Sequence, residues 1–450
     1  MDQIEGRPYW TATFDENGAL TGTPAAELVG EIADSGVVDL FVFSHGWNTQ
    51  IADAHTLYAR MFPLIKAKAD GEPSVSSIGF VGVVWPSIAF PDDPGTAEAA
   101  HGIGAQSADG SVAAPVNVTT TKSGAEITST MASAFSAGEQ DVLAQMGRLI
   151  DDGLRQAGDG TPDAVQRRNV EEFHALLRQL TGTFDGAAED AGELALTSSE
   201  QPVEDYQKLA TAMSTGTDAG DAQGIGSFFG KVWNGAKDAL RVATFWKMKA
   251  RAGQVGRSGL GPLLEQLHIA APTVRVHLIG HSFGARLVAN ALAGVSGPAA
   301  SPIASLTLVQ GAFSHWAFAQ HNPWDVQGSL FGTADRVHGP LVATFSAADW
   351  AVGRWYPKAS FLAGDDNQAA EHAGRWGGMG SDGFQSSGPT VELTLTAGQP
   401  SYPMAVGTFH PVDANAIIAD TSQSAFAGAH SDIVRDEVGW LIVQAARPIH

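Results

Sequence analysis

Nearly uninterrupted apolar runs alternate with helical spacing in the first part of the chain. Residues 37–43 and 78–85 are runs of Val, Ile, Leu and Phe with few polar interruptions. Such runs are typical of strands buried on both faces, as in a parallel sheet. Between them, residues 52–68 carry apolar side chains at helical spacing, and Pro63 is expected to cap or kink that helix. The strand–helix–strand order predicts an α/β fold.

The pattern changes in the middle of the chain. Residues 96–122 are mostly Ala, Gly, Ser and Thr, a composition that favours loop or partial disorder. Residues 138–157 and 164–181 have the periodicity of amphipathic helices. Residues 183–227 contain nine acidic residues and a single lysine, which indicates a solvated stretch.

A basic helix is predicted to end this middle block. Residues 228–251 return to helical periodicity with six basic residues and one aspartate. We expect this helix to dock on the acidic body or to lie near a substrate entrance. The sequence therefore predicts an α/β core in two parts, 1–95 and 251–450, interrupted by an inserted helical cap or lid over 96–250.

Strand and helix signals alternate again after the insertion. Strands are predicted at 274–280, 305–310, 341–345, 390–396 and 403–409, and helices at 260–267, 283–293 and 433–445. The predicted sheet is mostly parallel, with helices on its faces.

Composition excludes several classes of protein. The chain has 48 acidic and 26 basic residues and a formal net charge of −22, which argues against nucleic-acid binding and disfavours docking on anionic lipid. There are no cysteines, which excludes thiolate catalysis and disulfides. No signal peptide is recognisable and no apolar run approaches the ~20 residues of a membrane helix, so we expect a cytoplasmic protein without an integral membrane segment. A processed secreted form stays open, as does the oligomeric state.

One short motif suggests chemistry. In Gly280-His281-Ser282-Phe283-Gly284, a serine lies between two glycines at the point where a predicted strand meets a predicted helix. On so tight a turn the residues two positions away must be small, and the serine hydroxyl is presented at the end of the sheet beside the helix N-terminus. The pattern occurs only once in the chain. We interpret Ser282 as a nucleophile.

A serine nucleophile needs an oxyanion hole and a base. The first buried strand is followed by Ser44-His45-Gly46-Trp47-Asn48. The backbone N–H groups of Trp47 and Phe283 are the predicted oxyanion donors. A plain turn with a packed tryptophan is the alternative interpretation of this segment.

These motifs together resemble those of a known family. The order FVFSHGWNT, VVWPS and HLIGHSFGARLV is similar to a poorly characterised bacterial family of α/β-hydrolases with His-Gly-aromatic-Asn and Trp-Pro-Ser motifs. The resemblance covers roughly 35–95 and 250–450, whereas the insertion over 96–250 lies outside it. It implies the α/β-hydrolase fold and a catalytic triad in the chain order serine, acid, histidine.

Candidates for the acid and the base follow from their places in the chain. Asp349 comes just after the predicted strand 341–345, and Asp325 is the alternative. His430 lies on a loop ahead of the last predicted helix, whereas His410, the alternative base, is in a restrictive Phe-His-Pro setting that favours a structural role. We expect His281, beside the serine, to serve packing or hydrogen bonding.

The predicted mechanism is acyl transfer through Ser282, His430 and Asp349. Aromatic side chains are frequent at the predicted strand ends and would suit an ester with an apolar portion. The predicted pocket residues are His45, Trp85, Trp316 and Trp350. No metal or nucleotide-binding motif is recognisable, so no cofactor is expected.

Two other classes of function stay open at this point. The same triad could serve an acyltransferase or an amidase. Competition between water and another acceptor would distinguish acyl transfer from hydrolysis. A non-catalytic binding protein on the same fold would normally lack one triad position, whereas here each position has a candidate.

Overall fold

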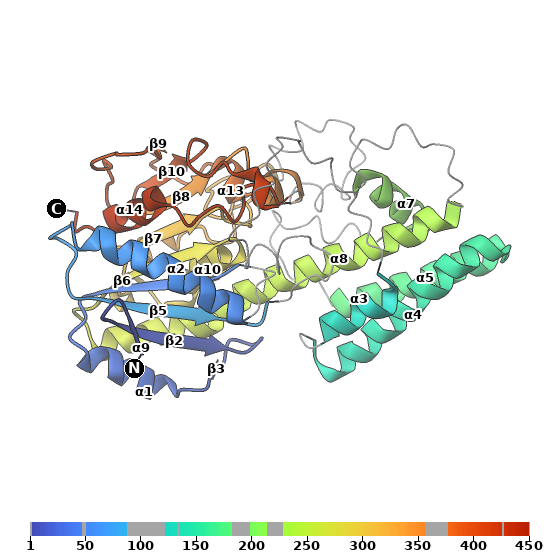
Figure 1. Ribbon diagram of the computed structural model, residues 1–450, viewed down its shortest axis with the longest axis horizontal. Coiled ribbons are helices and arrows are strands. Elements are labelled where there is room, and N and C mark those ends of the chain that lie inside the picture. Colours follow the sequence, from blue (N-terminus) through green and yellow to red (C-terminus); the bar gives the residue numbers. More distant parts are fainter. Residues whose placement is uncertain are drawn as a thin grey trace, which may run out of the picture.

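The computed structural model describes residues 2–46, 51–87, 122–132, 135–181, 199–213, 228–355, 377–424 and 427–449. Figure 1 shows a sheet flanked by helices, here called the sheet domain, and a group of helices that extends away from one end of it. Residues 96–121 of the predicted loop, and residues 183–198 and 214–227 of the acidic stretch, lie outside the described residues.

The sheet domain is an α/β structure with a mostly parallel sheet. Within the described residues the sheet has ten strands in the order β1-β2-β5-β4-β6-β7-β8-β10-β9, with β3 paired to β2. All neighbours from β2 to β9 pair in parallel, whereas β1 and β3 are antiparallel to β2. The strands are β1 (Asp2–Ile4), β2 (Arg7–Phe14), β3 (Leu20–Thr21), β4 (Asp39–Ser44), β5 (Ile78–Val84), β6 (Arg275–His281), β7 (Ile303–Val309), β8 (Leu341–Phe345), β9 (Leu393–Thr394) and β10 (Phe409–Asp413).

Helices cover both faces of this sheet (Figure 1). On one face lie α2 (Ile51–Ala69) and α14 (Asp436–Ala445), and on the other α1 (Ala25–Asp34), α9 (Gly261–Ala270) and α10 (Phe283–Gly294). Every residue of β4 is buried, with Phe41 and Phe43 packed on the first face and Leu40 and Val42 on the second. The apolar run that predicted a strand buried on both faces is confirmed.

The inserted helices are α3 (Gly124–Met131), α4 (Ala137–Asp159), α5 (Asp163–Thr181), α7 (Pro202–Met213) and α8 (Phe228–Val255). Helix α4 begins at a capping box made by Ser136 and Glu139, which satisfies backbone N–H groups that have no partner within the helix. Helix α8 extends from the inserted helices to the sheet domain (Figure 1), and its buried residues share one apolar core with α10. It crosses residue 250, the predicted end of the insertion.

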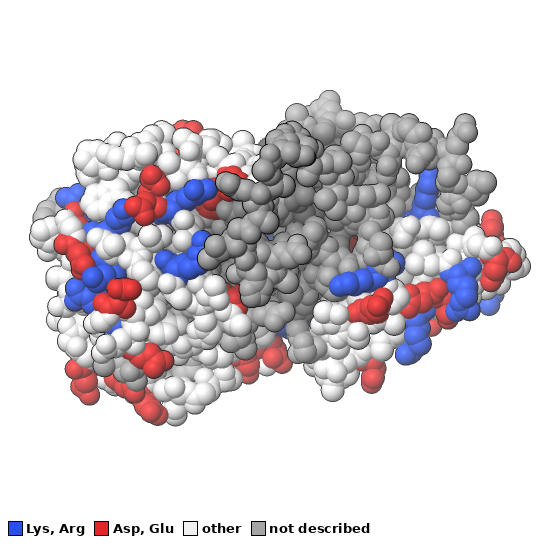
Figure 2. Space-filling view, viewed as in Figure 1, with Lys and Arg blue, Asp and Glu red and all other residues white. Residues whose placement is uncertain are grey.

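Three basic side chains of α8 have polar partners within the protein. Lys237 and Arg251 are 7% exposed and donate hydrogen bonds to the carbonyl oxygens of Lys122 and Pro86. Lys247 pairs with Glu139 of α4. On the face shown in Figure 2, acidic and basic side chains are interspersed over the described parts of the sheet domain and of α4 and α5. In the described part of the chain no helix combines the length and apolarity needed to cross a membrane.

One strand prediction is wrong in its position. A strand was expected at 403–409, but β10 begins only at Phe409. Gly407 has a φ of 64°, and the N–H of Thr408 bonds back to the carbonyl of Ala405, so this stretch is a turn. Pro411 lies inside β10 and obscures the strand signal there, because proline lacks the N–H that a strand usually donates.

Candidate active site

Ser282 lies at a strained turn between strand β6 and helix α10. Its backbone has φ 57° and ψ −124°, a region that residues with a side chain rarely adopt. The two glycines of the motif are required because a side chain at either position would clash with neighbouring backbone. A Cβ on Gly280 would lie 2.3 Å from the carbonyl oxygen of Gly284, and one on Gly284 would lie 2.1 Å from that of Ser44. The turn therefore presents the serine at the carboxyl end of β6, beside the first turn of α10.

The segment after β4 packs directly on this turn. A Cβ on Gly46 would lie 2.6 Å from the Cβ and 3.2 Å from the Oγ of Ser282. Only glycine fits this approach, which explains the His-Gly pair in the sequence. Trp47, the predicted oxyanion donor, lies outside the described residues. Phe283, the second predicted donor, is the first residue of α10, and its ring packs 4.7 Å from that of Phe245.

His45 is fixed by two neighbouring elements. Its ring stacks on Trp85, which follows β5, with centroids 5.5 Å apart. The Trp85 indole N–H donates to the His45 carbonyl oxygen at 3.1 Å, and the His45 N–H donates to the Tyr58 hydroxyl at 3.1 Å. Burial lowers the pKa of His45 to about 4, so the ring is neutral near pH 7. His45 and Trp85, both predicted to line a pocket, are each 1% exposed and support the segment that reaches Ser282.

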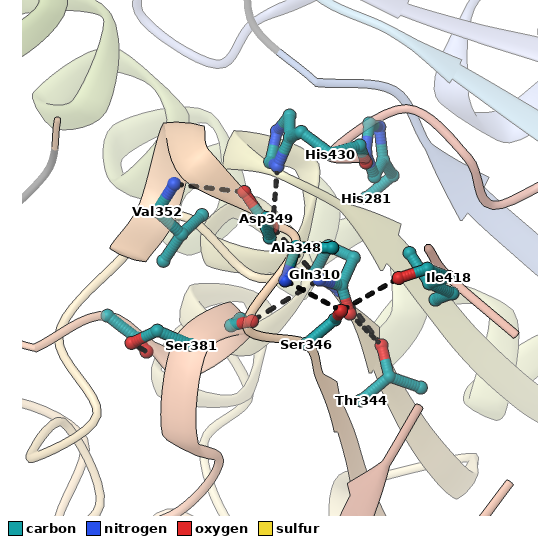
Figure 3. A network of polar contacts seen from close by, with 12 residues as sticks. His281, Gln310, Thr344, Ser346, Ala348, Asp349, Val352, Ser381, Ile418 and His430 are labelled. Carbon is teal, nitrogen blue, oxygen red and sulfur yellow. Dashed lines mark hydrogen bonds and ion pairs between the residues drawn. The ribbon is translucent and has the colours of Figure 1, made fainter. Parts of the chain in front are cut away.

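The predicted acid and base contact each other. Asp349 is fully buried just after β8, and its Oδ2 lies 2.8 Å from Nδ1 of His430 (Figure 3). A hydrogen bond from Nδ1–H to a carboxylate assigns the ring proton to Nδ1, which leaves the lone pair on Nε2. This is the tautomer in which a histidine accepts a proton from a serine through Nε2.

His281 connects the turn that carries Ser282 to the loop that carries His430. Nε2 of His281 donates to the carbonyl oxygen of His430 at 2.9 Å, and the two rings are 4.9 Å apart. Burial, followed by the nearby His430, lowers the pKa of His281 to about 3, so His281 is neutral near pH 7. The residue preceding Ser282 thus holds the backbone of the histidine loop.

The alternative acid and base lie in other settings. Asp325 is exposed on a loop. His410 is fully buried, with Nδ1 bonded to the carbonyl of Val391 and Nε2 to the N–H of Ala405. Both nitrogens of His410 therefore have backbone partners, which agrees with the structural role expected for it.

Two predicted pocket residues are only partly buried. Trp350 packs against the loop that carries His430, since a Cβ on Gly428 would lie 2.8 Å from its ring. Trp316 follows Gln310 in the loop after β7 and lies against the ring of His315, with centroids 4.6 Å apart.

Sequence reasoning missed Gln310, the residue that follows β7. It is fully buried, and its Nε2 donates to Oδ2 of Asp349 at 2.9 Å (Figure 3). The N–H of Val352 donates to Oδ1 of Asp349 at 3.0 Å. With His430, three donors thus surround the buried carboxylate. A polar residue directly after the apolar run 303–309 was the available signal.

A second Ser–His–Asp set lies near the opposite ends of the strands. Ser305 Oγ is 2.9 Å from Nδ1 of His277, whose Nε2 is 3.0 Å from Oδ1 of Asp39. Arg275 pairs with the same carboxylate at 2.6 Å. Ser305, His277 and Asp39 are each at most 1% exposed. We call these three residues the interior triad.

Within the described residues, no group of three or more His, Asp or Glu side chains is arranged to hold a metal ion. Comparison with known proteins found no significant match to a family model, to a curated protein or to a solved structure.

Proposed function

We propose that the sheet domain has the α/β-hydrolase fold and that the protein is a serine hydrolase that cleaves carboxylic esters. One observation carries this proposal. A serine with positive φ stands at a strand-to-helix turn, next to a loop whose histidine bonds through Nδ1 to a buried carboxylate. The family resemblance of the motifs points to the same class of protein.

In the proposed reaction His430 accepts the proton of Ser282 through Nε2 while the serine oxygen attacks the acyl carbonyl. Asp349 keeps the ring oriented and stabilises the imidazolium that forms. The backbone N–H groups of Phe283 and Trp47 hold the oxyanion. The imidazolium then protonates the leaving alcohol, and a water activated by the same histidine hydrolyses the acyl-enzyme.

Two features support His430 as the base of this reaction, rather than another histidine of the site. Burial lowers the pKa of His45 to about 4 and that of His281 to about 3. Both of these rings also have polar partners in the surrounding structure. His430 alone among the three bonds a carboxylate through Nδ1.

We propose an ester with an apolar portion because two partly exposed tryptophans belong to the loops that follow β7 and β8. Trp316 lies in the loop after β7, and Trp350 follows Asp349 in the loop after β8. Aromatic rings provide large apolar contact areas for an acyl chain or an aryl alcohol.

The proposal is tested by turnover of aryl esters of increasing acyl length. Wild type is expected to hydrolyse them with an optimum chain length, and the Ser282→Ala variant to lose this activity. Added alcohols or amines that divert the acyl group from water would indicate an acyltransferase. A folded wild type without turnover of esters, thioesters or amides would contradict the proposed function and favour a binding protein.

A further inference from the structure

Gln310 connects the proposed acid to the turn that carries the proposed nucleophile. Its side-chain amide donates to Oδ2 of Asp349 at 2.9 Å and to the carbonyl oxygen of Gly380 at 3.2 Å. Its Oε1 accepts from the hydroxyl of Thr344 at 2.9 Å. Figure 3 shows Gln310 between Thr344 and the Asp349 carboxylate that also binds His430.

The surroundings fix the orientation of this amide. The Thr344 hydroxyl accepts a hydrogen bond from the backbone N–H of Gln310 at 3.0 Å and donates one to Oε1 of the same residue. A flipped amide would place its oxygen against the Asp349 carboxylate and the Gly380 carbonyl, which accept hydrogen bonds but cannot donate them. Both N–H groups of the amide therefore face acceptors.

The strained backbone at Gln310 lies between two residues that bond the backbone of Ser282. Gln310 has a φ of 48°, which is uncommon for a residue with a long side chain. On either side of it, the carbonyl of Val309 accepts the N–H of Ser282 at 3.2 Å and the N–H of Ala312 donates to the carbonyl of Ser282 at 3.1 Å. The turn at Gln310 thus holds the serine by its backbone and the carboxylate by its side chain.

We propose that Gln310 is a positioning residue, whose amide holds Asp349 in the orientation that keeps the His430 ring directed at Ser282. This inference rests on the proposed function.

The first test compares Gln310→Met with wild type and with Gln444→Met. Gln444 is 3% exposed and lies near the end of α14, so Gln444→Met is a matched loss of a buried amide. In Gln310→Met we expect kcat to fall about 10- to 100-fold, the range seen when outer hydrogen-bond partners of metal-binding histidines are removed. KM is expected to change little, and Gln444→Met is expected to keep the wild-type kcat.

The pH profiles of two Gln310 variants provide the decisive readout. In Gln310→Met the amide is absent at every pH, so the loss of activity relative to wild type should be the same across the profile. In Gln310→Glu the new carboxyl donates only while it is protonated, so relative activity should fall as the pH rises. A Gln310→Glu profile that stays parallel to that of wild type would overturn the positioning role.

A partner variant tests the network itself. Thr344→Val removes the hydroxyl that orients the amide, and we expect a smaller loss of kcat in the same direction. Because both residues act on one carboxylate, the loss of kcat in the double variant, expressed as a free energy, should be smaller than the sum of the two single losses. Strict additivity would contradict a shared action on Asp349.

A spectroscopic measurement separates this inference from the proposed function. The Nδ1–H of His430 should give a strongly downfield proton resonance because it is donated to a carboxylate, and the Nε2–H···Asp39 contact of His277 provides an internal reference. In Gln310→Met the His430 signal should shift or broaden while that of His277 stays. An unchanged His430 signal would overturn the inference whether or not the wild type hydrolyses esters.

Discussion

The sheet domain contains two sets of Ser, His and Asp residues, and they differ in backbone conformation and in hydrogen bonding. In the interior triad, Ser305 lies within strand β7, next to a shift in its register with β6, and is 1% exposed. At the candidate active site, Ser282 stands on a turn with φ 57° beside a helix N-terminus. The same three side chains are thus built once into the sheet and once onto its carboxyl edge.

The histidines show the difference most clearly. His277 bonds the serine through Nδ1 and the carboxylate through Nε2, so both ring nitrogens are engaged within the core. His430 bonds its carboxylate through Nδ1, which directs Nε2 away from Asp349. Asp39 additionally pairs with the cation of Arg275, whereas the contacts of Asp349 come from neutral amide and backbone donors and from His430. A catalytic triad therefore requires the correct histidine tautomer and a serine at the carboxyl edge of the sheet, as well as the three residue types.

The largest expected effect comes from the two serines. We predict that Ser282→Ala lowers kcat by about 10⁶, the loss measured when the nucleophile of a well-studied serine hydrolase is removed. Ser305→Ala should keep the kcat of wild type, because Ser305 lies in the core. Ester turnover at substrate saturation measures both. Equal losses in the two variants would contradict the assignment of the nucleophile.

The two aspartates should separate activity from stability. Asp349→Asn is expected to lower kcat by about 10⁴ with little loss of fold, because the amide selects the wrong histidine tautomer. Asp39→Asn should keep kcat per folded molecule but lower the free energy of unfolding by about 2 kcal/mol, since a buried carboxylate that binds His277 and the partly exposed Arg275 loses its charge. Urea unfolding and kcat of each variant check this. An inactive but stable Asp39→Asn would contradict it.

A glycine substitution tests the approach of the two motifs. A methyl group on Gly46 would lie 2.6 Å from the Cβ of Ser282, so the turn or the loop must shift. We predict about a 100-fold loss of kcat/KM in Gly46→Ala, the size expected for a displacement of about 1 Å in a site. Gly30→Ala is the control, because a Cβ at Gly30 meets nothing within 4 Å.

The smallest expected effect concerns stability in acid. His281 takes up a proton in the unfolded chain at a pKa near 6.5 but in the folded protein only at about 3, so acidification favours unfolding. Between pH 7 and pH 5 we expect this residue alone to cost about 2 kcal/mol of the free energy of unfolding. His281→Gln should reduce the acid sensitivity by that amount in urea unfolding at the two pH values. The same pH dependence in variant and wild type would contradict the buried, neutral state of His281.

The parts of the structure that follow local patterns were predictable from the sequence. The apolar runs of β4 and β5 and the periodicity of α4 gave these elements nearly to their ends. Asp349 and His430 were selected as candidate acid and base because they come after a predicted strand and before the last predicted helix. Their hydrogen bond joins residues far apart in the chain, and only the fold brings it about.

Other features depend on contacts that the sequence does not reveal. Gln310 is a single polar residue after a strand, and its role depends on Thr344 and Gly380 from two other segments. The interior triad combines β4, β6 and β7, which requires the order of strands in the sheet. β10 was misplaced because Pro411 interrupts its pattern, while pairing with β8 and β9 sustains the strand.

The most direct test of the account is the site of labelling by a fluorophosphonate, which reacts only with an activated serine. Peptide mass spectrometry of the labelled wild type should place the adduct on Ser282, leave Ser305 unmodified, and find the labelling rate strongly reduced in His430→Ala. A folded wild type that is not labelled, or that carries the adduct on another residue, would contradict the assignment of Ser282 as the nucleophile.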